Sequence, residues 1–357
     1  MNSPRLQPGD EREPIAASPP AVFGRRVGKE IGGSFSIPGL KAGAIHKLIK
    51  KMMISPDTNI TPRKTAFWTT ESKLAYLLLF PAIAILVIFM FYPILYVFLM
   101  AFFRTNKLGQ IVNFIGGDNF LLLFKRQDFW EVTVRSVIWT VLAVAAKTIA
   151  GLIIALLLNV EFTGRRIYRT LVIIPWASSI PISAMLWQWT YNSEFGLLNH
   201  TLKATGLWDN PPLWLAYPRS AFFANMYVDV WCGIPFMAMV FLAGLQAIPR
   251  EIYESAEVDG ASAWTRFWAI TLPMLKRVLL IATLLSSLWT FNDFNVIYIL
   301  TRGGPGDTTD ILITFIYKYS FEFLKFGPAA AMAVITFIIL LGVSLIYARF
   351  YFRSEEL

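Results

Sequence analysis

The sequence predicts an all-α protein that crosses a membrane six times. Hydrophobic residues make up 56% of its 357 residues and charged residues only 15%, a composition unlike that of a soluble domain. Apolar stretches long enough to span about 30 Å of hydrocarbon recur along the chain, and they lack the alternation typical of membrane β-strands. Because backbone groups in lipid need partners within the same segment, we expect helices. The six expected spans are residues 74–102, 132–159, 167–191, 221–247, 274–300 and 330–352.

The residues before the first span differ in composition from the rest. Residues 1–38 are rich in Pro, Gly and Ser, contain no apolar core typical of a signal peptide, and are predicted to be a disordered tail. Residues 39–73 include the stretch LKAGAIHKLIKKMM, whose apolar and lysine side chains fall on different helical faces. This segment is either an amphipathic helix on an anionic membrane surface or a solvated basic tail.

The net charge is +9, and the basic residues lie mainly on one side of the expected spans. With the N-terminus inside, the cytoplasmic segments contain the basic residues of the first 73 and Arg165, Arg166, Arg250 and Arg266. A cytoplasmic excess of Lys and Arg is the usual pattern of a membrane protein. We therefore expect both termini, including residues 353–357, in the cytoplasm. The partner implied by the charge is membrane lipid and not nucleic acid.

The chain lacks the residue patterns of an enzyme. Its two histidines, His46 and His200, have no metal-ligand partner at helical spacing, and the lone Cys232 excludes an internal disulfide. The nearest match to a phosphate loop, Gly24-x-x-x-Gly28-Lys29, is one residue short and follows no strand. We expect no metal, no cofactor and no ATP hydrolysis in this chain, which disfavours a membrane enzyme.

Residues 249–273 form a polar insertion between two apolar spans. Pro249 can start a helix, because a first helical turn does not use its missing N–H. Gly260 then allows a sharp bend that a side chain would hinder. A second short helix, 261–269, leads back into the membrane. We expect a helix–bend–helix projection with small residues that a partner groove can approach closely.

Four stretches, in order along the chain, resemble the carbohydrate-importer permeases of the ABC superfamily, the maltose-transporter type among them. They are Leu79-Phe80-Pro81-Ala82 with Tyr92-Pro93, then Arg169 to Trp176, then Glu254-x-Ala256-x-x-x-Gly260 through Ile270-Thr271-Leu272-Pro273, and finally Thr301 to Pro305. Each stretch is weak alone, but four in the right order are specific.

The resemblance implies a six-helix permease core at 74–352 in a bacterial cytoplasmic membrane. It also implies a second permease subunit, an extracytoplasmic sugar-binding protein, and two ATP-binding-cassette ATPase subunits that would hold the ATP and Mg²⁺. The ATPase is expected to grip the 249–273 loop. The residues expected at that contact are Glu251, Glu254, Ala256, Asp259, Gly260 and Ala261.

Span five carries polar residues that point to a binding site. Ser286, Trp289, Thr290 and Asp293 stand at i, i+3, i+4 and i+7, which is one face of a helix. Hydroxyl and carboxyl groups can hydrogen bond a sugar, and an indole can cover its apolar face. The resemblance points to the same four positions, although the family has amides where this chain has Thr290 and Asp293. The alternative is hydrogen bonding between helices.

Spans two to four contribute further candidates. The resemblance places five residues at substrate-contact positions: Trp176, Ile180, Cys232, Gly233 and Phe236. Gly233 and Pro235 are expected to open the helix of span four and expose carbonyl groups beside a cavity. Lys147, a cation deep in span two, either extends to the membrane surface or pairs with Asp229 or Asp293.

These observations predict the permease subunit of an ATP-driven, binding-protein-dependent importer of a di- or oligosaccharide. Import of glycerol phosphate or a glycerophosphodiester is the alternative, and it requires cationic groups in the site. An ion-driven secondary transporter is a more distant alternative, because such proteins have repeated halves with matching broken helices. The chain shows one set of six spans and no clear internal repeat.

Overall fold

The computed structural model describes residues 70–353. The expected tail at 1–38, nearly all of the expected amphipathic segment at 39–73, and residues 354–357 lie outside this range. Contacts divide the chain into two units that meet after Leu78. The second unit contains the helices that hold the candidate site.

The described part is built from helices with a single pair of short strands. Three of the helical segments, labelled η, are single π-helical turns. In chain order the elements are α3 (Thr70–Leu86), η1 (Val87–Phe91), α4 (Tyr92–Ala101), β1 (Phe103–Thr105), β2 (Ile111–Phe114), α5 (Asp118–Phe124), α6 (Gln127–Asn159), α7 (Arg165–Ala177), α8 (Ile180–Thr190), α9 (Leu197–Ala204), α10 (Pro218–Gln246), α11 (Arg250–Val258), α12 (Ala263–Arg266), η2 (Phe267–Thr271), α13 (Leu272–Phe291), α14 (Phe294–Leu300), α15 (Leu312–Tyr317), η3 (Lys318–Glu322) and α16 (Phe326–Arg353).

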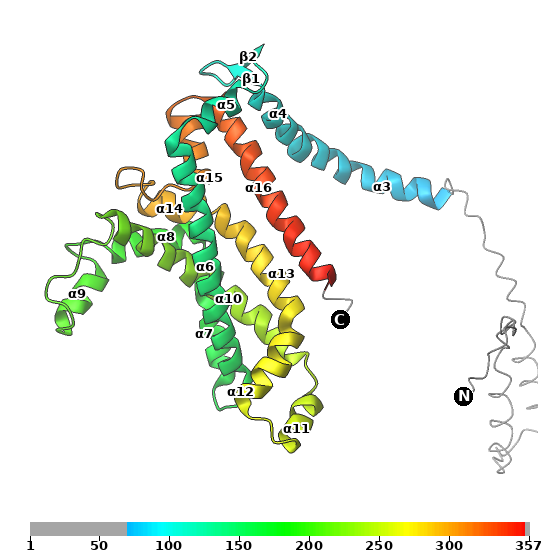
Figure 1. Ribbon diagram of the computed structural model, residues 1–357, viewed down its shortest axis with the longest axis vertical. Coiled ribbons are helices and arrows are strands. Elements are labelled where there is room, and N and C mark those ends of the chain that lie inside the picture. Colours follow the sequence, from blue (N-terminus) through cyan, green and yellow to red (C-terminus); the bar gives the residue numbers. More distant parts are fainter. Residues whose placement is uncertain (1–69, 354–357) are drawn as a thin grey trace, which may run out of the picture. The chain divides into compact units, whose positions relative to one another are not determined.

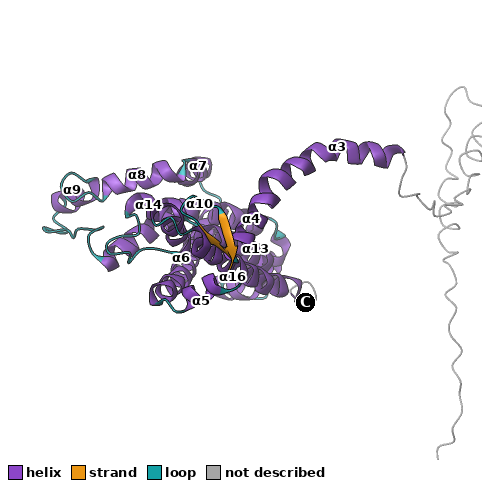
Figure 2. Ribbon diagram, turned by 90° about the horizontal axis from the view of Figure 1, so that it is seen from above, coloured by secondary structure: helices purple, strands orange, loops and turns teal. Residues whose placement is uncertain are grey.

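By length and composition, five helical runs in residues 70–353 can cross a membrane. They become six if α7 and α8, which meet at 92°, count as one span. The expected all-α fold with six spans is therefore confirmed, with one addition. The antiparallel strands β1 and β2, orange in Figure 2, form a hairpin that the sequence did not predict.

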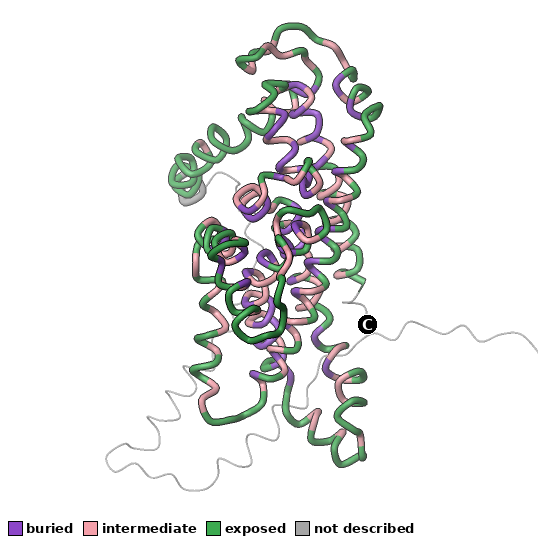
Figure 3. Tube along the Cα trace, turned by 90° about the vertical axis from the view of Figure 1, so that its left-hand side faces the viewer, coloured by how far each residue is buried: buried purple, intermediate pink, exposed green. Residues whose placement is uncertain are grey.

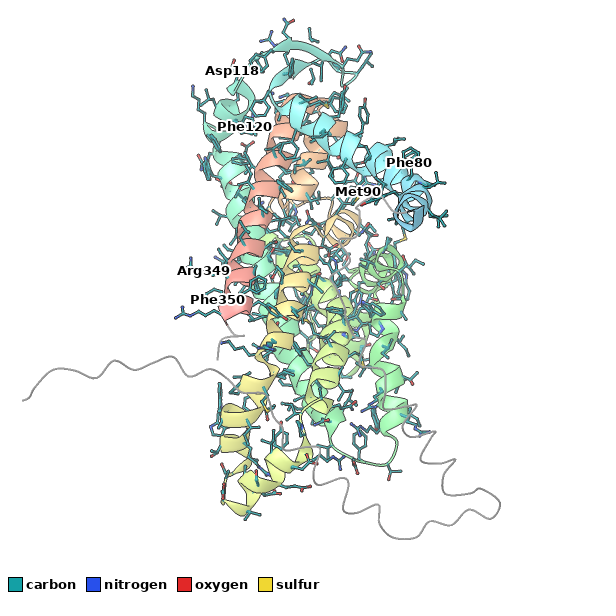
Figure 4. The ribbon with its side chains drawn as sticks, turned by 90° about the vertical axis from the view of Figure 1, so that its right-hand side faces the viewer. Phe80, Met90, Asp118, Phe120, Arg349 and Phe350 are labelled. Carbon is teal, nitrogen blue, oxygen red and sulfur yellow. The ribbon has the colours of Figure 1, made fainter. Side chains whose placement is uncertain are left out.

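The two ends of the second unit carry different elements. In Figure 1, β1, β2 and α5 lie at one end, and α11 and α12 lie at the other. We call the first the hairpin end. Helix α16 begins beside α5 and runs away from the hairpin end, so that Asp118 and Arg349 are far apart in Figure 4. Basic Arg349 thus lies toward the end that contains the 249–273 loop.

Helices α6 and α10 pack along each other more extensively than any other pair. Small residues permit this approach: a Cβ added to Gly151 on α6 would lie 2.6 Å from Met237 Cβ on α10. Helix α13 packs across both, and Gly244 on α10 leaves space for Leu275. In Figure 3 the buried segments lie where helices face one another, while the lower end is mostly exposed. The resulting core presents facing sides of α6, α10 and α13 to one another.

Charged groups link the loop between α14 and α15 to its neighbours. Lys318 Nζ lies 2.6 Å from both Asp307 Oδ1 and Asp310 Oδ2, and Arg135 donates to the backbone oxygen of Asp307 at 2.8 Å. Burial raises the pKa of Asp310, although hydrogen bonds from Lys318 and Thr314 oppose this. Burial also disfavours the charge of Lys318, but its two carboxylate partners outweigh that and raise its pKa. The ion pairs join the loop to η3, and the hydrogen bonds from Arg135 to the backbone oxygens of Asp307 and Asp310 join it to α6.

Three of the expected spans differ in detail from the structure. Span three is two helices, because Ser178 and Ser179 are extended and Pro181 lacks the N–H needed to continue a helix. Span five ends at Phe291 and a new helix begins after Asp293. Span four is not opened at Gly233 and Pro235, since α10 continues through both. A proline removes one backbone hydrogen bond, which a well-packed helix tolerates.

Candidate functional site

A buried ion pair connects α6 to α10 in the helical core. Lys147 Nζ donates to Asp229 Oδ1 at 2.7 Å and lies 2.7 Å from Oδ2. It also donates to Thr290 Oγ1 on α13 at 2.7 Å. The exposed fractions are 4% for Lys147, 6% for Asp229 and 1% for Thr290. An isolated charge here would be costly, so the pair and the hydroxyl serve as each other's partners.

Gly233 provides the space that Lys147 needs to reach across. A Cβ at this position would lie 2.7 Å from Lys147 Cε and 2.8 Å from Cδ. Such distances are shorter than any real contact between carbon atoms, so a side chain would displace the lysine. Gly233 is therefore required because the Lys147 side chain passes so close to α10, and not because the helix opens there.

The break between α13 and α14 places the carboxylate of Asp293 at the same cavity as Lys147 and Asp229. Asn292 ends α13, and Asp293 is the N-cap residue of α14, where its Oδ1 accepts from the Val296 N–H at 3.3 Å. On the other side of the break, Trp139 Nε1 donates to the Thr290 carbonyl oxygen at 3.2 Å. Two side chains thus satisfy backbone groups that the break leaves free.

The break between α7 and α8 is stabilised locally by serine. Ser178 Oγ donates to the Pro175 carbonyl oxygen at 2.8 Å and lies 2.7 Å from Ser183 Oγ. The two helices meet at 92°. This bend brings the last turn of α7 and the first turn of α8, with Trp176 and Ile180, to the same cavity.

These helices line a partly open cavity of about 610 Å³ beside the ion pair. Its size is within the range of small-molecule sites, which are mostly apolar with a few polar groups. It is lined by Lys147, Pro175, Trp176, Ile180, Asp229, Cys232, Gly233, Phe236, Ser286, Leu288, Trp289, Asn292, Asp293 and Asn295. The ring centroids of Phe236 and Trp289 are 4.9 Å apart in an edge-to-face arrangement. Aromatic faces, amides and a carboxylate therefore share one space.

The 249–273 loop forms the helix–bend–helix that the sequence predicts. Helix α11 ends in a paired turn: the Gly260 N–H donates to the Glu257 oxygen at 3.0 Å, and the Ala261 N–H to the Ala256 oxygen at 2.9 Å. Gly260 has φ +79°, a conformation that favours glycine. The expected second helix does not stop before Pro273. It starts at Ala263 and continues through η2 into α13, and the π-helical turn Phe267–Thr271 lies just before Pro273, which has no N–H to donate.

Side chains fix this loop to the helices above it. Arg250 at the start of α11 is paired with Glu161 just beyond α6. The hydrogen bond from Arg250 lowers the pKa of Glu161, so the carboxylate stays charged. Arg266 lies 2.7 Å from Glu257, and Tyr253 Oη lies 3.0 Å from Thr271 Oγ1. These contacts connect α11 to Glu161 beyond α6, to α12 and to η2 before α13.

A family model for "Binding-protein-dependent transport system inner membrane component" matches residues 147–355. The chain belongs to this family. It is a multi-pass membrane component of a transport system. The matched part includes Lys147, both halves of span three, the 249–273 loop and the break at Asp293.

Individual relatives cover most of this permease. The trehalose/maltose transport system permease protein MalF of Thermococcus litoralis is 38% identical over 279 residues, 78% of this chain and 94% of the relative. The sulfoquinovosyl glycerol transport system permease protein SmoG of Agrobacterium fabrum is 34% identical over 306 residues, 84% and 97% of the two chains. A chain of a bacterial ABC transporter that imports the acidic polysaccharide alginate has a TM-score of 0.69 and 25% identity, covering 79% of the permease and 96% of that chain.

The structure brings most of the predicted binding residues together. Eight of them line the cavity: Asp293, Trp289, Ser286, Gly233, Cys232, Phe236, Trp176 and Ile180. Thr290 does not line the cavity, and its hydroxyl oxygen instead accepts a hydrogen bond from Lys147 in the buried core. The reason given for Asp293 was wrong, since it does not continue the helical face of Ser286. The chain break turns it toward the cavity instead.

Four polar lining residues were not among the predicted site residues. Asn292 and Asn295 line the cavity but were missed. The sequence predicts one continuous helix for span five, and in such a helix both residues would lie off the face of Ser286. A usable signal was present, since Asn-Asp is an unusual pair inside an apolar span. Lys147 and Asp229 were considered only as a pair, and the structure selects Asp229 over Asp293 as the partner of Lys147.

The predicted contact residues of the 249–273 loop extend from the first turn of α11 to the bend at Gly260. Glu251, Glu254, Asp259 and Gly260 are exposed, whereas Ala256 and Ala261 are half-buried. Within residues 70–353 no cluster of three or more His, Cys, Asp or Glu is arranged to hold a metal ion.

Proposed function

We propose that this chain is the permease subunit of an ATP-driven, binding-protein-dependent importer of a di- or oligosaccharide. The observation that carries the proposal is the cavity of about 610 Å³ at the two broken spans. Discontinuous helices around a central cavity are a common way to bind a solute within the membrane. Two relatives with names that refer to sugars, and the alginate importer, support the saccharide.

The lining suits a sugar in particular. Trp289 and Phe236 offer rings to the apolar face of a pyranose, and Asp293 and Asn295 offer groups that hydrogen bond hydroxyls. Trp176 and Trp289 remain more than half exposed in the single chain, so a ligand or a second permease subunit can reach them. Carbonyl groups of α10 have no part in this arrangement, because that helix continues unbroken.

The energy is proposed to enter through the 249–273 loop. Exposed Glu251 and Glu254 on α11 and exposed Asp259 precede the bend at Gly260, with half-buried Ala256 and Ala261 on either side of it in the chain. Two partner ATPase subunits would hold the ATP and Mg²⁺ and move this loop, while the chain itself performs no covalent chemistry. In this proposal the loop and both termini face the cytoplasm of a bacterial cell, and the hairpin end faces a sugar-binding protein outside the cytoplasmic membrane.

Import of glycerol phosphate or a glycerophosphodiester is less well supported. Such a solute needs a cationic group, and Lys147 is the only basic residue among those that line the cavity. Its ammonium group is already bonded to Asp229 and Thr290.

The proposal is tested by reconstituting the permease with its partner permease, ATPase subunits and binding protein in liposomes. We expect uptake of a labelled disaccharide panel to require ATP on the ATPase side, and an ion gradient without ATP to drive none. Asp293→Ala should reduce uptake at least about tenfold without loss of complex assembly, because it removes a hydrogen-bonding carboxylate. Asp209→Ala, in the exposed loop before α10, is the matched control. Uptake driven by an ion gradient alone would refute the proposed function.

A further inference from the structure

A second, partly open cavity of about 650 Å³ lies between α6, α13 and α16, and it shares no lining residue with the candidate site. Its lining extends from Val137 to Ile149 on α6, from Thr283 to Phe291 on α13 and from Ile339 to Tyr347 on α16. All three helices belong to runs that can cross a membrane. We call this space the α6–α13–α16 groove.

The serine and threonine hydroxyls of this groove are already bonded within their own helices. Thr140, Thr148, Thr283 and Ser287 each donate to the backbone oxygen four residues earlier, at distances between 2.6 and 2.9 Å. The one O–H of each side chain is thereby used. Apart from these residues and Tyr347, the lining is made of Val, Ala, Ile and Phe. The groove therefore suits a hydrocarbon chain and not a polar solute.

The length of the groove matches the acyl region of one membrane leaflet. Residues 137–149 of α6 rise about 18 Å along the helix axis, and half of a hydrocarbon core is about 15 Å thick. Helices α6 and α16 run away from the hairpin end, and α13 runs toward it (Figure 1). Ile149, Thr283 and Tyr347 therefore mark the same end of the groove, which is the end toward the 249–273 loop.

Basic side chains follow the groove at this end. Lys276 stands seven residues before Thr283 on α13, and Arg353 stands seven residues after Ile346 on α16, a spacing that keeps each on the groove face of its helix. Both are exposed, and neither has an ion-pair partner within residues 70–353. Helices α13 and α16 contain no Asp or Glu. The hydroxyl of Tyr347 likewise has no hydrogen-bond partner in the described part of the chain.

We propose that the α6–α13–α16 groove binds an acyl chain of an anionic phospholipid, whose phosphate is held by Lys276 and Arg353. Basic side chains at the end of a membrane helix extend to the headgroup level and attract anionic lipids there. Tyr347 lies where its hydroxyl can hydrogen bond the polar part of the lipid. A helix of another subunit would fill the hydrocarbon part but would leave both cations without a partner. The proposal adds a lipid ligand to the proposed function and does not depend on which solute is carried.

The test uses the complete transporter in bilayers of phosphatidylcholine that contain a minor fraction of phosphatidylglycerol. A photoreactive acyl chain is carried by one of these lipids or by the other, and the cross-linked peptides are identified by mass spectrometry. We expect adducts on α6, α13 and α16, with at least about fivefold more from phosphatidylglycerol. Lys276→Gln combined with Arg353→Gln should remove this preference. Arg166→Gln combined with Lys203→Gln, two exposed positions on α7 and α9, should leave it intact.

A second variant tests the acyl part separately from the headgroup. Ala145→Trp fills the groove at an exposed position of α6 and should abolish adducts on the three helices. Ala243→Trp, at an exposed position of α10 that does not line the groove, is the matched control. Equal labelling by the two lipids in the wild-type transporter would overturn the proposal. Adducts that persist in Ala145→Trp, or groove residues that cross-link to the partner permease in place of lipid, would overturn it as well.

Discussion

Lys147 and Asp229, 82 positions apart in the chain, form an ion pair in the helical core with Nζ 2.7 Å from the carboxylate oxygens. The pair has two consequences. It fixes α6 against α10 beside the cavity, and it uses the one cation that could otherwise bind an acidic solute. Replacement of either partner should therefore affect stability and not only binding.

The first prediction concerns this pair. Lys147→Met leaves Asp229 buried without a counter-ion and should lower the free energy of unfolding by about 3–5 kcal/mol. The double variant Lys147→Met with Asp229→Leu replaces both charges by apolar groups and should recover most of that loss. The measurement is thermal unfolding of the purified complex. Lys203→Met, on the exposed face of α9, is the control for the first change. A double variant less stable than either single variant would contradict the assignment.

The second prediction concerns the glycine that faces the lysine. Gly233→Ala places a Cβ 2.7 Å from Lys147 Cε, so the side chain must move and the ion pair must distort. Overpacking of this kind costs about 1–3 kcal/mol. Gly342→Ala in α16, where an added Cβ meets no atom within 4 Å, is the matched control within another span. Comparable melting temperatures for the two variants would show that the site has room to relax.

The six spans could be predicted from the sequence because each depends on local composition alone. Long apolar runs must be helical in lipid whatever surrounds them. The breaks could not be located in this way, since a proline inside a span can either interrupt a helix or be accommodated. Pro235 lies within the unbroken α10, whereas Pro181 follows the break before α8. Around Pro235 the neighbouring Gly233 packs against Lys147 of another helix, which is a tertiary contact, whereas the bond between Ser178 and Ser183 is local but forms only where the chain has already turned.

The sequence predicted which residues belong to the candidate site better than it predicted how they are arranged. Asp293 was chosen for its position on a helical face with Ser286, yet it lies in the cavity because the helix ends two residues before it. Thr290 does belong to that face, but it binds Lys147 and does not line the cavity. The partner of Lys147 could not be chosen from spacing, because it lies on another helix 82 positions away.

The third prediction tests the bend of the 249–273 loop. Gly260 and Gly206 both have positive φ, +79° and +67°, and an added Cβ at either meets no atom within 4 Å. Gly260→Val and Gly206→Val should therefore impose a similar local strain of at least about 1–2 kcal/mol. Only the Gly260 variant should lose ATPase binding and transport. Equal loss of transport in both variants, or no loss in either, would contradict a specific role of the loop in binding the ATPase.

The fourth prediction concerns the effect of pH on the charged loop between α14 and α15. The folded state raises the pKa of Lys318 through Asp307 and Asp310, against the effect of burial. Its stabilisation is therefore complete below the unfolded pKa of about 10.4 and is lost as pH rises through the higher folded value. Lys318→Met should lower the free energy of unfolding by about 3–5 kcal/mol at pH 7, because Asp310 is fully buried. The gap in melting temperature between wild type and this variant should stay constant to about pH 10 and then narrow. Lys203→Met should show no such gap, and a gap that widens with pH would contradict the ion-pair assignment.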